Sequence, residues 1–184
     1  MPQLKLSTLA IILGLIMGLP QIYGFIKPES FRNAVRSFPR SMPWGLALMI
    51  TGTLWFVYNL SLESISDFAS YKNVLIGGFA GVGIGTCFFV QDFLAVRGLA
   101  VVLLLLAKLM VDTGRPHLDQ TGWVLIFQTW AYAMIFAGMW FTISPWRLRD
   151  LLDWATASEQ RIKVGCGIRL LFGLFIAALG FLKF

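Results

Sequence analysis

Charged residues are scarce in this sequence. Only 13% of its 184 residues are Asp, Glu, Lys or Arg, whereas a soluble domain usually carries about 25%. This shortage excludes an ordinary water-soluble globular protein, which needs charged side chains on its surface. Apolar residues make up 58% of the chain, in runs that approach or exceed the ~20 residues needed to cross ~30 Å of hydrocarbon. We therefore expect an all-α, polytopic integral membrane protein.

Cysteine and histidine are also rare. The two cysteines, Cys87 and Cys166, lie inside apolar segments, where they are expected to be small core residues and not disulfide partners. The single histidine, His117, excludes bis-histidine haem binding within one chain. The sequence contains no Gly-x-Ser-x-Gly elbow, phosphate-binding loop or His-Glu-x-x-His motif. We therefore expect no catalytic site, no metal site and no cofactor.

The apolar runs predict six transmembrane helices in a single transmembrane domain, residues 1–184. The expected spans are residues 4–26, 44–60, 74–93, 98–112, 122–143 and 163–181. Two further stretches, 29–38 and 145–158, combine an apolar face with arginines on the opposite face. This pattern is typical of helices that lie in the plane of the membrane interface.

The two ends of the chain resemble each other. Phe31-Arg32 follows Pro28 at the same offset as Leu148-Arg149 follows Pro145, and each segment lies between two spans. This similarity predicts two parallel repeats, each a span, an interfacial helix and a span, on either side of a central hairpin. The alternative is that any pair of apolar helices joined by a basic segment looks alike.

The distribution of basic residues predicts the orientation. Nine lie in the first, third and fifth loops: Lys27, Arg32, Arg36, Arg40, Arg97, Arg147, Arg149, Arg161 and Lys163. The opposite side holds four, Lys5, Lys72, Arg115 and Lys183, or five if Lys108 is counted with them. The excess of Lys and Arg on cytoplasmic loops places the odd-numbered loops in the cytoplasm and both termini outside, in a cell inner membrane. We expect Arg32, Arg36, Arg40, Arg147 and Arg149 to lie on the anionic membrane surface, so the net charge of +6 needs no nucleic-acid partner.

A ridge of glycines marks the third span. Gly77, Gly81 and Gly85 recur every four residues and so share one face of a helix. Such a face is poor in water but lets another helix approach closely in a bilayer. We expect this ridge to be the internal seam of the bundle, in a hairpin with the fourth span.

Polar residues within spans are the candidate functional residues, because charge in the bilayer centre is costly. They are Arg169, Asp92, Arg97, Lys108, Asp112, Gln91 and Gln128. The spacing predicts a salt bridge between Asp92 and Arg97 across the hairpin turn, and an i,i+4 pair between Lys108 and Asp112. Arg169 is expected to reach the surface or to pair with a carboxylate. Most of these residues lie near span ends, which favours a structural role over a transport path.

Three functions are consistent with these features. The first is a non-enzymatic accessory or scaffold subunit of a larger inner-membrane complex, whose partners are lipid and other membrane-protein subunits or a second copy. The alternative is a transporter or channel for a small solute or ion, lined by the intramembrane polar residues. The third is a lipid-modifying enzyme that uses His117 and Asp119.

Overall fold

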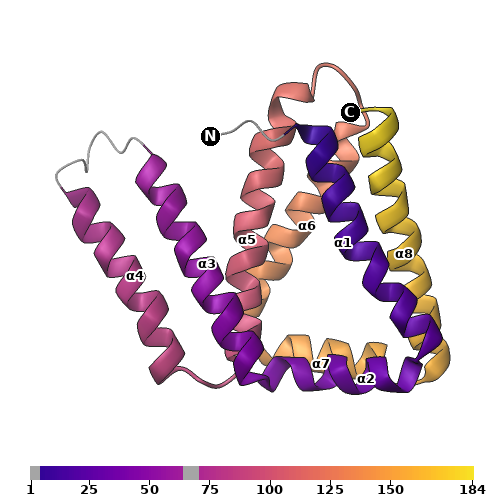
Figure 1. The fold of residues 1–184 in the computed structure, drawn as a ribbon, viewed down its shortest axis with the longest axis horizontal. Coiled ribbons are helices and arrows are strands. Elements are labelled where there is room, and N and C mark those ends of the chain that lie inside the picture. The colour runs from indigo at the N-terminus through magenta and orange to yellow at the C-terminus, as the bar shows by residue number, and fades with distance from the viewer. Residues whose placement is uncertain (1–4, 64–70) are drawn as a thin grey trace. The chain divides into compact units, whose positions relative to one another are not determined.

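All the described secondary structure is helical, in a computed structural model that describes residues 5–63 and 71–184 (Figure 1). The elements are α1 (Leu6–Ile26), α2 (Pro28–Ser37), η1 (Phe38–Arg40), α3 (Met42–Leu62), α4 (Lys72–Phe89), α5 (Leu94–Gly114), η3 (Arg115–His117), α6 (Val124–Ile143), α7 (Trp146–Ala155) and α8 (Glu159–Leu182). Among the described residues, six helices are long and apolar enough to cross a membrane: α1, α3, α4, α5 with η3, α6 and α8. The all-α class and the six candidate spans are confirmed. The first predicted residue, 4, lies outside the described residues.

The boundary between the third and fourth spans differs from the prediction. Helix α4 ends at Phe89 and α5 begins at Leu94, so the residues predicted to end one span form the turn. Phe93 has a φ of 55°, a left-handed conformation uncommon outside glycine. Its carbonyl oxygen accepts hydrogen bonds from the backbone of Val96 at 3.0 Å and Arg97 at 3.1 Å. The first turn of α5 therefore forms directly after this residue, earlier than hydropathy indicates.

The chain divides into two compact units. Unit 1 comprises Met1–Arg36, Leu106–Met134 and Arg149–Phe184, and unit 2 comprises Ser37–Leu105 and Ile135–Leu148. Helices α5 and α6 each contribute one part to each unit.

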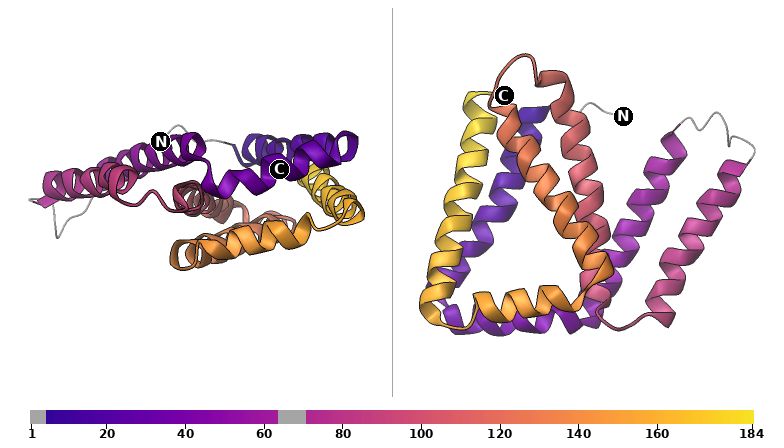
Figure 2. Two further views of the ribbon diagram at one scale, coloured as in Figure 1. Left: turned by 90° about the horizontal axis from the view of Figure 1, so that it is seen from below. Right: turned by 180° about the vertical axis from the view of Figure 1, so that it is seen from behind.

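In unit 1, α1 and α8 pack side by side in opposite directions (Figure 1; Figure 2, right). Gly14 and Gly18 of α1 face Gly173 of α8, while Gly24 lies against Cys166 nearer the start of α8. A Cβ atom added to Gly173 would lie 2.6 Å from the Gly14 carbonyl oxygen and 2.9 Å from the Gly18 amide nitrogen. The two backbones are therefore closer than any side chain would allow. This is the small-residue packing by which helices associate in lipid.

In unit 2, α3 packs against α4 and lies between α4 and the first half of α5 (Figures 1 and 2). Met49, Cys87 and Leu94, one from each helix, form a buried cluster. Gly45 of α3 and Gly98 of α5 bring their two helices together, since a Cβ at Gly98 would lie 2.8 Å from the Met49 nitrogen. The neighbour of α4 in this unit is therefore α3, and the expected hairpin of α4 with α5 is not formed.

The expected glycine ridge is not a seam of unit 2. A Cβ added to Gly77 or Gly81 would meet no atom within 4 Å, and one at Gly85 would meet only Phe89 of the same helix. The close contact of α4 with α3 is made instead by Gly83, which faces Thr53. The prediction chose the wrong face of α4. The spacing of glycines shows which faces of a helix lack side chains, but it does not show which face another helix covers.

The α1–α8 seam leads to a first prediction. We expect Gly173→Ala to cost about 1–3 kcal/mol of stability, because its methyl group overpacks two backbones. The measurement is thermal unfolding of the purified protein in detergent. Gly81→Ala is the matched control, and it should be neutral or gain up to about 1 kcal/mol from helix propensity. Equal losses in the two variants would contradict this assignment of the seam.

Candidate functional site

Three of the predicted intramembrane polar residues gather in unit 1, on α5 and α6. The Lys108 Nζ lies 2.8 Å from Asp112 Oδ2, so the predicted i,i+4 pair is confirmed. On α6, the side chain of Gln128 is only 6% exposed, and its Nε2 donates to the Val111 carbonyl oxygen at 3.2 Å. Its Oε1 is buried and accepts no hydrogen bond from the described residues. Of the polar residues within the spans of unit 1, Lys108, Asp112 and Gln128 come nearest to forming a site.

The Lys108–Asp112 pair is about half exposed. The two side chains are 45% and 52% exposed, although they lie on a span of 24 residues, Leu94–His117. Charged groups inside spans normally face a bundle interior or a water-filled cavity. This pair therefore presents opposite charges on an outward face of α5.

The two residues proposed for catalysis do not form a dyad. The Nδ1 of His117 lies 3.3 Å from the Thr113 carbonyl oxygen one turn earlier, while Asp119 is exposed. Among the described residues, no hydrogen bond or ion pair joins His117 to Asp119. Each therefore has the surroundings of a residue at the end of a helix.

The remaining polar candidates lie apart. In unit 2, Gln91 and Asp92 are exposed in the turn before α5, and the buried Arg97 Nε has no hydrogen-bond partner among the described residues. No ion pair joins Asp92 to Arg97 in the described part of the chain, so the expected salt bridge is absent. In unit 1, Arg169 is half-buried on α8 and no described carboxylate forms an ion pair with it.

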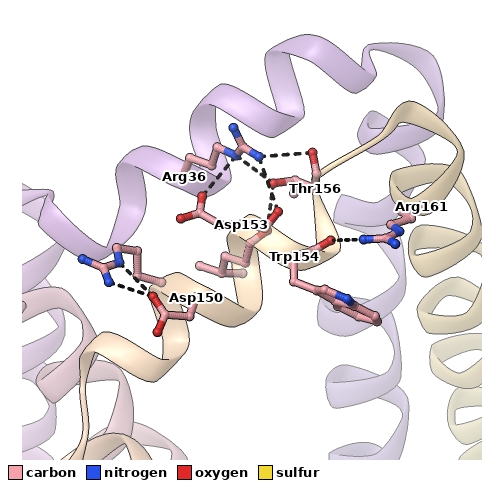
Figure 3. A network of polar contacts seen from close by, with 8 residues as sticks. Arg36, Asp150, Asp153, Trp154, Thr156 and Arg161 are labelled. Carbon is pink, nitrogen blue, oxygen red and sulfur yellow. Dashed lines mark hydrogen bonds and ion pairs between the residues drawn. The ribbon is translucent and has the colours of Figure 1, made fainter.

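The best-built polar cluster joins α2 to the end of α7 (Figure 3). The Arg36 Nε donates to Thr156 Oγ1 at 2.9 Å and lies 3.2 Å from Asp153 Oδ1. Its Nη2 donates to the backbone carbonyl oxygens of Asp153 at 3.4 Å and Thr156 at 3.5 Å. Thr156 is 3% exposed, and its hydroxyl donates in turn to the Leu152 carbonyl oxygen at 2.7 Å.

This cluster stabilises the end of α7 for two physical reasons. The last carbonyl groups of a helix lack partners within the helix, and here one guanidinium group supplies donors to them. Its positive charge also lies at the negative end of the helix dipole. Arg36, which was predicted to lie on the membrane surface, thus caps a helix whose end is 120 residues away in the sequence. Asp153 and Thr156 were not predicted, because no local pattern links either residue to α2.

The other basic residues predicted for the membrane surface differ in their surroundings. Arg149 pairs with Asp150 at 2.7 Å, and the Arg40 guanidinium lies 5.9 Å from the centre of the Phe93 ring. Arg147 is exposed, whereas Arg32 is half-buried, and its Nε has no hydrogen-bond partner in the described part of the chain. Two of the five arginines, Arg36 and Arg149, are therefore at least partly neutralised by carboxylates of the same unit.

An apolar groove of about 400 Å³ lies between α6 and α8 in unit 1. Its lining residues are Leu125, Ile126, Thr129, Trp130, Ala133 and Phe172. Trp130 meets Phe172 edge to face at 5.5 Å, and the Thr129 hydroxyl donates to the Leu125 carbonyl oxygen. The walls are therefore hydrocarbon and aromatic rings, with no charged group.

No group of three or more His, Cys, Asp or Glu residues suited to a metal ion occurs within residues 5–63 and 71–184. Comparisons with protein-family models, with curated proteins and with solved structures found no match to this chain.

The Arg36 cluster leads to a second prediction. We expect Arg36→Gln to lower stability by roughly 1–2 kcal/mol, because it removes charge-assisted hydrogen bonds from a partly exposed site. Hydrogen exchange should quicken at the amides of Thr156 and Ala157, which close the end of α7. The control is Arg147→Gln, which replaces an exposed arginine at the start of α7 and should leave this exchange unchanged. Unchanged exchange in Arg36→Gln would show that the guanidinium does not cap α7.

Proposed function

We propose that this protein is a non-enzymatic accessory or scaffold subunit of a larger inner-membrane complex. The observation that carries the proposal is the uncovered state of α4. Only Cys87 of this helix is buried, although its 18 residues form a candidate membrane span. A span that packs on one neighbour leaves most of its circumference to lipid or to another protein.

The chemistry of the uncovered face favours a protein helix over lipid alone. The glycines at 77, 81 and 85 form a groove without side chains, flanked by the exposed Val74 and Val82. Such a groove lets a second backbone come close enough for extensive van der Waals contact, which drives helix association in lipid. The partner in this proposal is a transmembrane helix of another subunit.

A third prediction tests this proposal. We expect Gly81→Leu to fold normally but to lose the membrane subunit that co-purifies with the wild-type protein from native membranes. Gly165→Leu is the control, because Gly165 is another glycine where an added Cβ meets nothing within 4 Å. If the wild-type protein purified alone, or if Gly81→Leu kept its partner, the role proposed for α4 would be wrong.

The proposed orientation has the α2 and α7 ends of the spans in the cytoplasm and both termini outside. The excess of basic residues in the connecting segments supports it. The fourth prediction is therefore that Ser158→Cys, at the start of α8, is labelled by a membrane-impermeant thiol reagent only after the cells are opened. Asp119→Cys should be labelled on intact cells. Both native cysteines are buried, which keeps the background low, and the reverse labelling pattern would overturn this orientation.

A transporter or channel is the second candidate. It is favoured by the buried Gln128, whose unpaired Oε1 belongs to the same part of unit 1 as Lys108 and Asp112. Transport would require these groups to line a continuous path. Gln128 is hydrogen-bonded to Val111, and Lys108 is paired with Asp112. These contacts suit a role in helix packing better than a role in the passage of a solute or ion.

A further inference from the structure

The apolar groove between α6 and α8 has the depth of one half of a bilayer. Its lining on α6 begins at Leu125, in the first turn of that helix, and ends at Ala133, near its middle. At 1.5 Å per residue this distance is about 12 Å along the axis, compared with about 15 Å for one half of the hydrocarbon core. On α8 the lining residue is Phe172, which also lies near the middle of its helix. When α6 and α8 cross a membrane, the groove therefore extends from one surface to about the middle.

The walls of the groove favour a hydrocarbon occupant. Leu125 is 59% exposed and Ala133 is exposed, so the groove is open to the surroundings of unit 1. The only hydroxyl among the lining residues, on Thr129, donates to the Leu125 carbonyl oxygen at 2.7 Å. A bound water needs several polar partners, which these walls do not supply, whereas an acyl chain can pack against the rings of Trp130 and Phe172. A transmembrane helix of another protein needs a surface along the full ~30 Å of a span, and the groove offers less than half of that length.

Basic side chains lie at the end of unit 1 where the groove begins. The centres of the Phe184 and Phe127 rings are 6.3 Å apart, which places the end of α8 beside the first turns of α6. Lys183 is exposed there, and Arg115 is exposed on η3, shortly before α6. Within the described residues 113–125 and 180–184, the only carboxylate side chain is Asp119. Because Arg and Lys form strong hydrogen bonds with phosphate, this end of the groove favours an anionic headgroup.

We propose that the α6–α8 groove holds one acyl chain of an anionic phospholipid, whose headgroup lies beside Arg115 and Lys183. The headgroup is then at the membrane surface, while the chain reaches the Trp130–Phe172 contact near the middle of the two spans. The proposal concerns unit 1 alone and does not depend on the partner proposed for α4.

The experiment is mass spectrometry of the intact, purified protein in detergent, titrated with phosphatidylglycerol or with phosphatidylcholine that has the same acyl chains. The wild-type protein should bind its first phosphatidylglycerol about tenfold more tightly than its first phosphatidylcholine, because two basic residues favour the anionic headgroup. Arg115→Gln with Lys183→Gln should remove this preference and leave the binding of phosphatidylcholine unchanged. Lys27→Gln, at an exposed lysine at the opposite end of α1 and α8, is the control and should retain the preference.

A second variant tests whether the chain of the lipid occupies the groove. Ala133→Phe adds a ring at an exposed lining position, where it takes the space of the acyl chain, and it should abolish binding of the first lipid of either kind. Ala178→Phe is the matched control, because Ala178 is an exposed alanine of α8 that does not line the groove, and this variant should bind like wild type. Ala133→Leu, a smaller change with the same expected direction, provides the test if the phenylalanine variant does not fold.

Three outcomes would overturn the proposal. They are equal affinity of the wild-type protein for the two lipids, lipid binding by Ala133→Phe at the wild-type level, and a bound pigment or second chain, in place of lipid, that is lost from Ala133→Phe. The assay contains no other protein. A negative result therefore says nothing about the subunit proposed for α4, and loss of that subunit leaves lipid binding unaffected.

Discussion

The close approach of α1 and α8 is the interaction on which the rest of unit 1 depends. In a bilayer, two helices gain little by covering apolar surface, because lipid tails are equally apolar. Attraction must come from dense contact between backbones, and side chains at the crossing would prevent it. Glycines at 14, 18 and 173 remove those side chains, so the first and last spans of the chain are held in direct contact.

This contact also sets the position of the interfacial segments of unit 1. Since α1 and α8 run in opposite directions, the end of α1 and the start of α8 lie at the same end of the unit. Gly24 faces both Cys166 and Phe31 there, so the start of α2 and the start of α8 both lie against the end of α1. Arg36 at the other end of α2 then reaches the last carbonyl groups of α7. Packing in the spans and hydrogen bonding outside them thus act on the same helices.

Polar side chains have different surroundings outside the membrane spans and within them. Outside the spans, Arg36 and Arg149 both pair with carboxylates of unit 1. Such exposed pairs are worth little individually. Within the spans, Lys108 pairs with Asp112 in unit 1, and α4 in unit 2 keeps a smooth face. This uncovered face of α4 is the basis of the proposal that the protein functions in an assembly.

Local patterns in the sequence were sufficient to predict several features of the structure. The length and apolar content of the runs gave six spans, because crossing hydrocarbon requires about 20 such residues whatever their neighbours. The Lys108–Asp112 pair followed from i,i+4 spacing on one helix. In both cases the cause lies within a single segment, so one sequence contains the necessary information.

Other features were decided by the tertiary structure alone. Gly77, Gly81 and Gly85 have the same spacing whether or not a helix covers them, and here the glycines at 14, 18 and 173 pack instead. Asp92 and Arg97 are close in sequence, but no ion pair joins them in the described residues, where Phe93 is left-handed and α5 begins at Leu94. Arg36 meets Thr156 across 120 residues, a pairing that no local pattern encodes. Periodicity makes a helix face suitable for packing, whereas the choice of its partner depends on which other faces compete for it.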